Sequence, residues 1–243
     1  EAGALLAGVD FGLPGGIPKK QFDRFTRALI HGEILRGRLE AGKEQTYVFY
    51  DRLTDQISHL FWQFYRPDEP EFAERPPSPQ AVTGLKDMVP AAYRTADHIL
   101  GRLLEAAGPD TNVLIVSDHG FHAIPPARGF TFGAGEANPP RSGHHQHGEP
   151  GVFVLAGPHV CASNEPGRIS ILDFAPTVLY LRGLPSADNL PGDVIGKAFC
   201  GDWLDAHPPR KIPTFEYPGW RSRNIQAAAD AGTLQDLKEL GYL

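Results

Sequence analysis

Cysteine and methionine are scarce in this chain, and the scarcity of cysteine limits the cysteine-based metal sites and disulfides that the chain can form. Its 243 residues include two cysteines, Cys161 and Cys200, and one methionine. The cysteines have no Cys-x-x-Cys spacing, which argues against a zinc knuckle and against a framework of several disulfides. One disulfide and two free thiols are both compatible with the sequence.

Long apolar runs and an excess of basic residues are also missing. No stretch has the roughly 18 apolar residues that a membrane-spanning helix needs, and the first residues lack the basic start and apolar core of a signal peptide. The formal net charge is -6, so we expect no sequence-specific binding of nucleic acid, which needs a basic surface. The compartment and the oligomeric state stay open.

The composition is that of a globular domain, with 41% hydrophobic and 21% charged residues. A chain of this length can bury a full core. The sequence begins at Glu1 without methionine and soon enters Gly-rich text at 12–16. We therefore expect a fragment or a processed chain.

Helical spacing of apolar residues recurs along the chain. It predicts an amphipathic helix over 21–40 that ends at Gly42, and a longer helix over 80–107. The expected buried stripe of the second helix is Tyr93, Ile99, Leu100, Leu103 and Leu104. Further helices are expected from Asp173, as N-cap, to Arg182 with Gly183 as the stop, and over 225–240.

Short apolar runs predict buried strands at 46–50, 112–117 and 151–156. Five prolines make 66–79 an irregular surface segment, and a His-rich loop over 125–150 is expected to be functional. Strands that alternate with helices indicate an α/β fold with a mostly parallel central sheet covered by helices on both faces.

Metal-ligand residue types recur at suggestive spacings. Asp55 and His59 are one helical turn apart, so both side chains lie on one helix face. Asp118 and His119 follow a predicted strand, where open α/β sheets place their sites, and His147 lies in the His-rich loop. Each motif alone has an alternative, such as a solvated helix face. Together, two carboxylates and three imidazoles favour a zinc centre, and two ions about 4 Å apart can stabilise an in-line displacement.

Five motifs in order resemble one family. They are Asp-x-x-x-His-x-x-Trp at 55–62, Val-x-x-x-Ser-Asp-His-Gly-Phe at 113–121, His-x-x-x-Gly-Val-Phe at 147–153, Asp-Phe-Ala-Pro-Thr-Val-Leu-Tyr-Leu-x-Gly-Leu-Pro at 173–185, and the closing 237–243. The order resembles the alkaline phosphatase superfamily, and most of all its type I phosphodiesterase/nucleotide pyrophosphatase branch. The main likeness covers about residues 45–200.

The resemblance implies two divalent ions, zinc or alternatively manganese. Asp55, His59 and His147 would hold one ion; Asp118 and His119 would hold the other, with an early Asp and a nucleophilic Thr or Ser. That early segment is not found in the sequence, so we expect the nucleophile upstream of Glu1, a fold incomplete at its N-terminus, and an inactive fragment. Three further histidines either form hydrogen bonds to the metal ligands or are loop residues without a role at the site: His122, His144 and His145.

The same resemblance divides the chain into three parts. Residues 1–44 would form a linker and helix, as part of a cap subdomain, 45–200 the metal-binding α/β core, and 201–243 a tail with a closing helix. The implied activity is hydrolysis of a small phosphorylated substrate, most of all a phosphodiester or nucleotide, through a phospho-enzyme. The alternatives are a non-catalytic metal-binding module, or a phosphomonoesterase, phosphonate hydrolase or phosphoglycerate mutase.

Overall fold

The computed structural model describes residues 19–126, 140–145, 149–161 and 167–216. They form an α/β structure of helices and small sheets. The chain divides into two compact units. The first contains the described residues of 1–108 and 119–150, and the second contains the described residues of 109–118 and 151–216.

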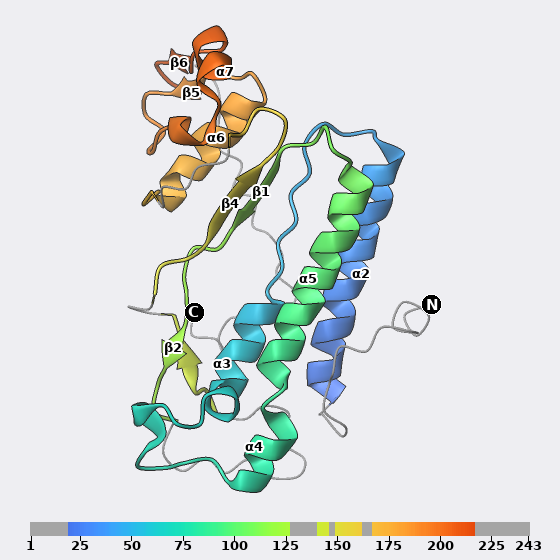
Figure 1. The fold of residues 1–243 in the computed structure, drawn as a ribbon, viewed down its shortest axis with the longest axis vertical. Helices are drawn as coiled ribbons and strands as arrows, with labels where there is room; N and C mark the ends of the chain where they lie inside the picture. The colour runs from blue at the N-terminus through green and yellow to red at the C-terminus, as the bar shows by residue number, and fades with distance from the viewer. Residues whose placement is uncertain (1–18, 127–139, 146–148, 162–166, 217–243) are drawn as a thin grey trace. The chain divides into compact units, whose positions relative to one another are not determined.

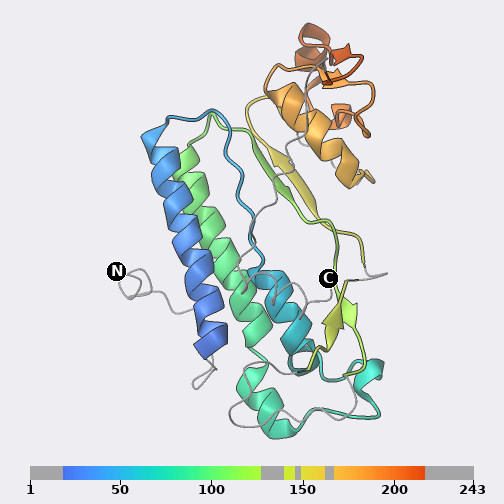
Figure 2. The same ribbon diagram turned by 180° about the vertical axis from the view of Figure 1, so that it is seen from behind.

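Four α-helices form most of the described first unit: α2 (Lys19–Ala41), α3 (Leu53–Tyr65), α4 (Pro79–Leu85) and α5 (Met88–Ala107). The helix predicted over 21–40 is confirmed as α2, and Gly42 ends it with a φ of 59°, a left-handed conformation that glycine adopts without strain. Helices α2 and α5 run side by side (Figures 1 and 2).

The core of this unit lies where α2, α3 and α5 meet. Its largest fully buried side chains include Phe25 of α2, Phe61 of α3 and Met88 of α5. A Cβ on Gly32 would lie 2.7 Å from Cγ2 of Ile99, so glycine permits the close approach of α2 to α5. This packing fixes the helix that carries Asp55 and His59.

The helix predicted over 80–107 is two helices, because α4 ends at Leu85 and α5 begins after its N-cap residue Asp87. The predicted buried stripe was also partly wrong: Tyr93 is 56% exposed and Leu104 is 44% exposed. Packing against α2 and α3 selects a different face of α5. The residues it buries are Met88, Val89, Ala91, Ala92, Thr95 and Ile99.

The strand predicted at 46–50 is wrong, since this segment has no regular secondary structure. Val48 and Tyr50 are exposed, and Phe49 packs against the core. The alternation is that of an extended segment, but no described strand pairs with it. The proline-rich segment 66–79 is irregular as predicted, with one 3-10 turn at Pro70–Phe72.

A short antiparallel hairpin pair completes the described first unit. Strand β2 (His122–Ala123) pairs with β3 (Gly143–His144), and His122 lies opposite His144. The strand β3 runs beside α3: the N–H of Ser142 donates to the carbonyl of His59 at 2.9 Å. Residues from the predicted functional loop are thereby brought against the Asp55/His59 helix.

The second unit contains the strands predicted at 112–117 and 151–156. They are β1 (Val113–Val116) and β4 (Phe153–Ala156), which pair antiparallel. Both are half-exposed, not buried as expected. In this pairing Val113 lies opposite Ala156 and Val116 lies opposite Phe153.

Short elements form the rest of the described second unit. They are η2 (Ile171–Asp173), α6 (Phe174–Leu181), β5 (Ser186–Ala187), η3 (Gly196–Ala198), α7 (Gly201–Ala206) and β6 (Lys211–Ile212). Helix α6 begins after Asp173 and stops before Gly183, as predicted, although the Asp173 side chain caps the preceding turn by accepting from the N–H of Ser170. A disulfide joins Cys161 to Cys200.

The expected mostly parallel central sheet is not found in the described residues. They contain three two-stranded sheets, and β5 with β6 is the parallel pair among them. The prediction took strand–helix alternation to mean parallel pairing, whereas β1 pairs with a strand that returns beside it. The helix predicted over 225–240 lies outside the described residues.

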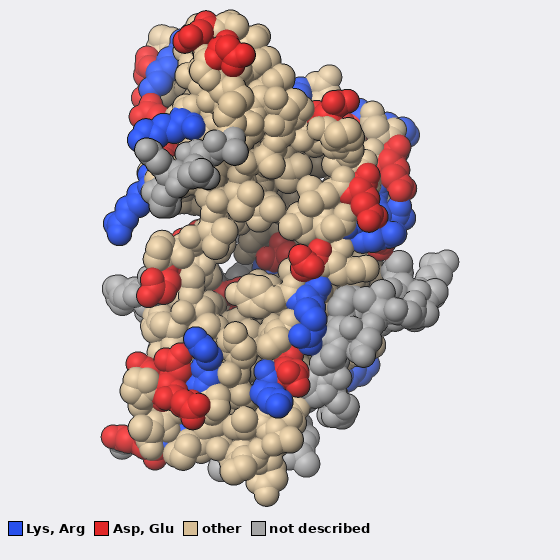
Figure 3. Space-filling model, viewed as in Figure 1, with Lys and Arg blue, Asp and Glu red and all other residues tan. Residues whose placement is uncertain are grey.

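Charged side chains of both signs are interspersed on the face drawn in Figure 3. Several form ion pairs along one helix, such as Lys19 with Asp23 at 3.0 Å on α2. In the described part of the chain, no helix combines the length and the apolar character that crossing a membrane requires.

Candidate metal centre

Asp55 and His59 lie one turn apart on α3, with Oδ1 of Asp55 3.4 Å from Nε2 of His59. The imidazole is fully buried and the carboxylate is partly buried. Both residues belong to a helix whose opposite face carries core side chains such as Ile57 and Phe61. The predicted pairing of these side chains on one helix face is therefore found.

The tautomer of His59 follows from its partner. Nδ1 lies 2.8 Å from the carbonyl oxygen of Gly143, which can only accept a hydrogen bond, so Nδ1 carries the proton. Nε2 of the neutral ring is then an acceptor directed towards another acceptor, Oδ1 of Asp55. Histidine ligands of metals commonly donate their other ring N–H in this way.

A third donor comes from the loop after β3. His145 places a ring nitrogen so that it, a carboxylate oxygen of Asp55 and a ring nitrogen of His59 all lie within 4.8 Å of one another. A tetrahedral zinc with bonds of about 2.0–2.2 Å holds its donors about 3.4 Å apart, the separation of Asp55 and His59. Oδ1 of Asp55 is buried and accepts no hydrogen bond. A buried oxygen without a hydrogen-bond partner is typical of an atom that binds a cation.

His119 extends this group. Its Nδ1 lies 3.0 Å from the carbonyl oxygen of Gly120, which again makes Nδ1 the donor and Nε2 the acceptor. Nε2 lies 3.9 Å from Oδ1 of Asp55, and the ring stacks on His145 with centroids 4.0 Å apart. Three imidazoles thus surround one carboxylate.

The electrostatics keep Asp55 ionised. Burial alone would raise the pKa of Asp55, but its interactions with His59, His119 and His145 outweigh the effect of burial, so the pKa of Asp55 is lowered. Metal ligation requires the carboxylate form. The described group therefore has the donor set and the charge that a divalent transition metal needs.

A guanidinium lies beside the group. One terminal nitrogen of Arg141 is 3.2 Å from Nδ1 and 3.5 Å from Nε2 of His59. Burial, together with the charge of Arg141 and neighbouring imidazoles, lowers the pKa of His144 to about 4. The site thus combines one carboxylate with a fixed positive charge that could attract an anion.

A family model for the type I phosphodiesterase / nucleotide pyrophosphatase domain matches residues 18–158. The chain belongs to this family. The family is part of the alkaline phosphatase superfamily, so the resemblance carried by the sequence motifs is confirmed. Searches of curated proteins and of solved structures gave no match. Type I phosphodiesterases are metal-dependent phosphoester hydrolases, and the Asp/His group on α3 agrees with that chemistry.

The structure brings together some, but not all, of the metal ligands predicted for this phosphodiesterase-family chain. Asp55 and His59 lie together, and His119 lies beside them. Asp118 is exposed and belongs to the second unit, and His147 lies outside the described residues. His145, expected to support the ligands or to be a plain loop residue, is itself a member of the three-residue group.

Arg141 was missed by the sequence analysis. Its signal was a single basic residue directly before the Ser-Gly-His-His run of the loop. That signal has no periodicity or spacing to distinguish it from an ordinary loop arginine. The contact with His59 depends on how the loop packs against α3.

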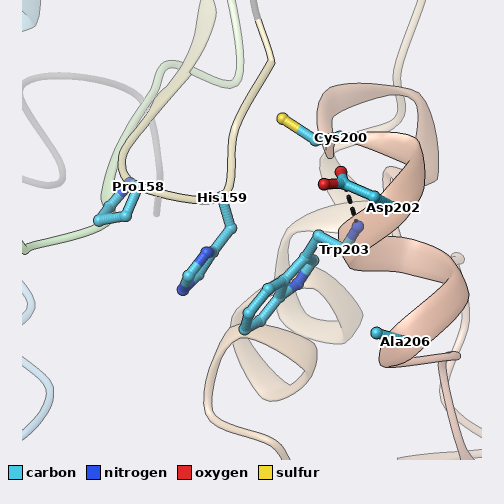
Figure 4. A pocket seen from close by; sticks show the side chains of 6 residues that line it. All are labelled: Pro158, His159, Cys200, Asp202, Trp203 and Ala206. Carbon is cyan, nitrogen blue, oxygen red and sulfur yellow. Dashed lines mark hydrogen bonds between the residues drawn. The ribbon is translucent and has the colours of Figure 1, made fainter.

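A separate cavity of about 230 Å³ lies in the second unit, between His159 and the short helix α7 (Figure 4). Its main wall is Trp203, whose indole stacks on His159 with centroids 3.4 Å apart and on His207 at 3.8 Å. Both faces of the indole are covered, so neither can stack on a ligand. We assign this cavity no binding role.

Proposed function

We propose that this chain serves the metal-dependent hydrolysis of phosphoesters, most of all phosphodiesters or nucleotide-type substrates. One observation carries the proposal: the 3.4 Å separation of two acceptor atoms, Oδ1 of Asp55 and Nε2 of His59, in a buried setting. Two acceptors this close need a proton or a cation between them. The membership of a phosphodiesterase family favours the cation.

Asp55, His59 and His145 are the proposed ligands of one ion, which we take to be zinc because one carboxylate with imidazoles suits it. His147 was expected from the family resemblance and stays a prediction. His119 and Asp118 are proposed for a second ion. The position of Nε2 of His119 near Asp55 supports His119 as a ligand of this second ion. Asp118 is proposed as its partner because it directly precedes His119 in the sequence.

When bound, such an ion would polarise the phosphoryl group and favour the ionised form of an attacking hydroxyl or water. The protein's own groups would then orient the substrate. Gly143 holds the His59 ring through its carbonyl oxygen, and Arg141 offers N–H donors to a phosphoryl oxygen beside that ring. The Thr or Ser expected to attack phosphorus is not among the residues to which we assign roles.

The proposal is tested first by metal content, because that readout does not depend on a nucleophile. The purified chain is stripped with a chelator, dialysed against buffered Zn²⁺ and analysed for zinc per chain. Asp55→Ala should lower the content by one ion, and His31→Ala, an exposed residue of α2, should leave it unchanged. An Asp55→Ala protein that keeps all its zinc and its fold contradicts the proposed site.

A pair of variants distinguishes the two candidate third ligands. His145→Ala should lose the same ion as Asp55→Ala, whereas loss of that ion in His147→Ala alone would assign the position to His147. Hydrolysis of bis(p-nitrophenyl) phosphate and of p-nitrophenyl phosphate by the zinc-loaded chain then separates diesterase from monoesterase activity. Hydrolysis of either ester would contradict the alternative of a non-catalytic metal-binding module, which binds zinc without turnover.

A further inference from the structure

His122 and His144 form a second pair of imidazoles outside the three-residue group. They lie directly opposite each other in the antiparallel β2–β3 ladder. Directly opposite residues project from the same face of a ladder, so the two rings are neighbours. Their centroids lie 6.2 Å apart with an angle of 47° between the ring planes.

One nitrogen of this pair is buried without a partner. Nδ1 of His122 is shielded from solvent and makes no hydrogen bond within the described residues. A buried nitrogen without a partner is costly, and an ion that completes its coordination is one way to remove the cost. This observation is independent of the strand register.

The separation of the rings is close to what a shared ion needs. Zinc binds an imidazole nitrogen at about 2.0–2.1 Å, so two imidazoles at a tetrahedral angle have centroids ~5.2 Å apart. The observed 6.2 Å exceeds this by roughly 1 Å, which side-chain rotations can close. The remaining coordination positions would be filled by water.

We infer that His122 and His144 bind a divalent ion of the imidazole-preferring class, Zn²⁺, Ni²⁺ or Cu²⁺, as a clip across the β2–β3 hairpin. The site uses neither Asp55 nor His59 and needs no substrate. The clip joins the two ends of the connection between β2 and β3, so its stabilisation grows with the loop entropy that it removes from the unfolded chain. It also fixes the strand from which Gly143 and His145 reach the candidate centre.

The experiment measures zinc stoichiometry and the zinc-induced rise in thermal midpoint for the purified chain. The variants are His122→Phe and His144→Phe, which keep a ring in place. The control is His31→Phe, at an exposed position of α2. The two hairpin variants should each bind one ion fewer than wild type. At free zinc of ten times the clip's dissociation constant, wild type should gain about an 11-fold increase in its folding constant that both variants lose.

Asp55→Ala separates this inference from the proposed function. It should lose a different ion, so Asp55→Ala with His122→Phe should lose both. An unchanged zinc count and an unchanged midpoint shift in folded His122→Phe and His144→Phe would overturn the clip, whatever Asp55→Ala does. If a phenylalanine variant does not fold, His144→Gln, which keeps a polar side chain, provides the same comparison.

Discussion

The carbonyl oxygen of Gly143 accepts a hydrogen bond from Nδ1 of His59 at 2.8 Å, across 84 residues of sequence. This contact orients the buried ring and selects the tautomer whose Nε2 faces Asp55. It depends on the absence of a side chain at position 143. The orientation of His59 on α3 is therefore set partly by a glycine in a strand that is distant in sequence.

Gly143→Ala should weaken zinc binding at Asp55 and His59 by about tenfold, within the range seen when a supporting contact of a ligand is lost. A Cβ at this position would lie 2.6 Å from the carbonyl oxygen of Ser58, 2.7 Å from Phe121 and 2.9 Å from Trp62. The strand would have to move away from α3, taking the acceptor oxygen with it. Zinc titration against a competing chromophoric chelator measures the change.

Gly37→Ala is the matched control for this prediction. Gly37 lies in α2, and a Cβ there meets nothing within 4 Å. Alanine is the better helix former by about 0.5–1 kcal/mol, so this variant should be slightly more stable and bind zinc normally. Equal zinc affinity in the two variants would mean that Gly143 does not orient His59.

Arg141→Met should weaken the binding of inorganic phosphate to the zinc-loaded chain about tenfold, because the variant loses the charge-assisted hydrogen bonds of the guanidinium to the phosphoryl oxygens. The substitution keeps a long apolar stem and removes the guanidinium, whose nitrogen lies 3.2 Å from Nδ1 of His59. Inorganic phosphate binding by calorimetry gives a readout that needs no turnover.

Arg141→Lys checks the interpretation, because lysine keeps the charge but lacks the planar pair of donors. A partial return of phosphate affinity indicates an electrostatic role. Wild-type phosphate affinity in Arg141→Met would exclude a role in substrate binding.

Local patterns in the sequence predicted the parts of the site that a single element builds. Asp55 and His59 share a helix face because α-helical periodicity places residues four apart together. His145 was not recognised as a ligand candidate of equal rank, since its position depends on the pairing of β3 with β2 and its packing on α3. The contact of Arg141 with His59 is likewise non-local, and no periodicity encodes it.

For the fold as well, the sequence predicted several single elements but not how the strands pair. The strands β1 and β4 and the ends of α2 and α6 follow from apolar runs and from glycines with positive φ. Strand direction does not follow from them, and the antiparallel pairing of β1 with β4 was missed. The sequence left the state of Cys161 and Cys200 open because spacing alone does not bring two cysteines together.

Reduction of the Cys161–Cys200 disulfide should destabilise the second unit without removing zinc from α3. The bond closes a loop with a sequence separation of 39, for which the chain-entropy estimate is about 4 kcal/mol. Urea unfolding of wild type with and without a phosphine reductant, and of Cys161→Ser with Cys200→Ser, measures the loss. Equal midpoints in all three conditions would show that the bond contributes nothing to stability.

The Glu33 carboxylate joins α2 to α5, with Oε2 2.7 Å from Nε of Arg36 and Oε1 3.3 Å from Nε of Arg102. Burial raises the pKa of Glu33, but the two guanidinium groups outweigh it and hold the pKa below its ordinary value of 4.5. A carboxylate with a lowered folded-state pKa stabilises the fold above its unfolded pKa, and this contribution is lost as the pH falls through the folded pKa.

Glu33→Gln should therefore destabilise the protein at pH 7 by less than about 1 kcal/mol, the usual range for pairs that solvent partly screens. The difference from wild type should shrink as the pH falls through the lowered folded-state pKa of Glu33, and 1 M NaCl should reduce it at neutral pH. Urea unfolding at a series of pH values measures this difference in stability. The control is Glu105→Gln, at an exposed position of α5. A difference that is constant from pH 7 to pH 3 would mean that Glu33 acts through packing, because the charge of the carboxylate would then contribute nothing.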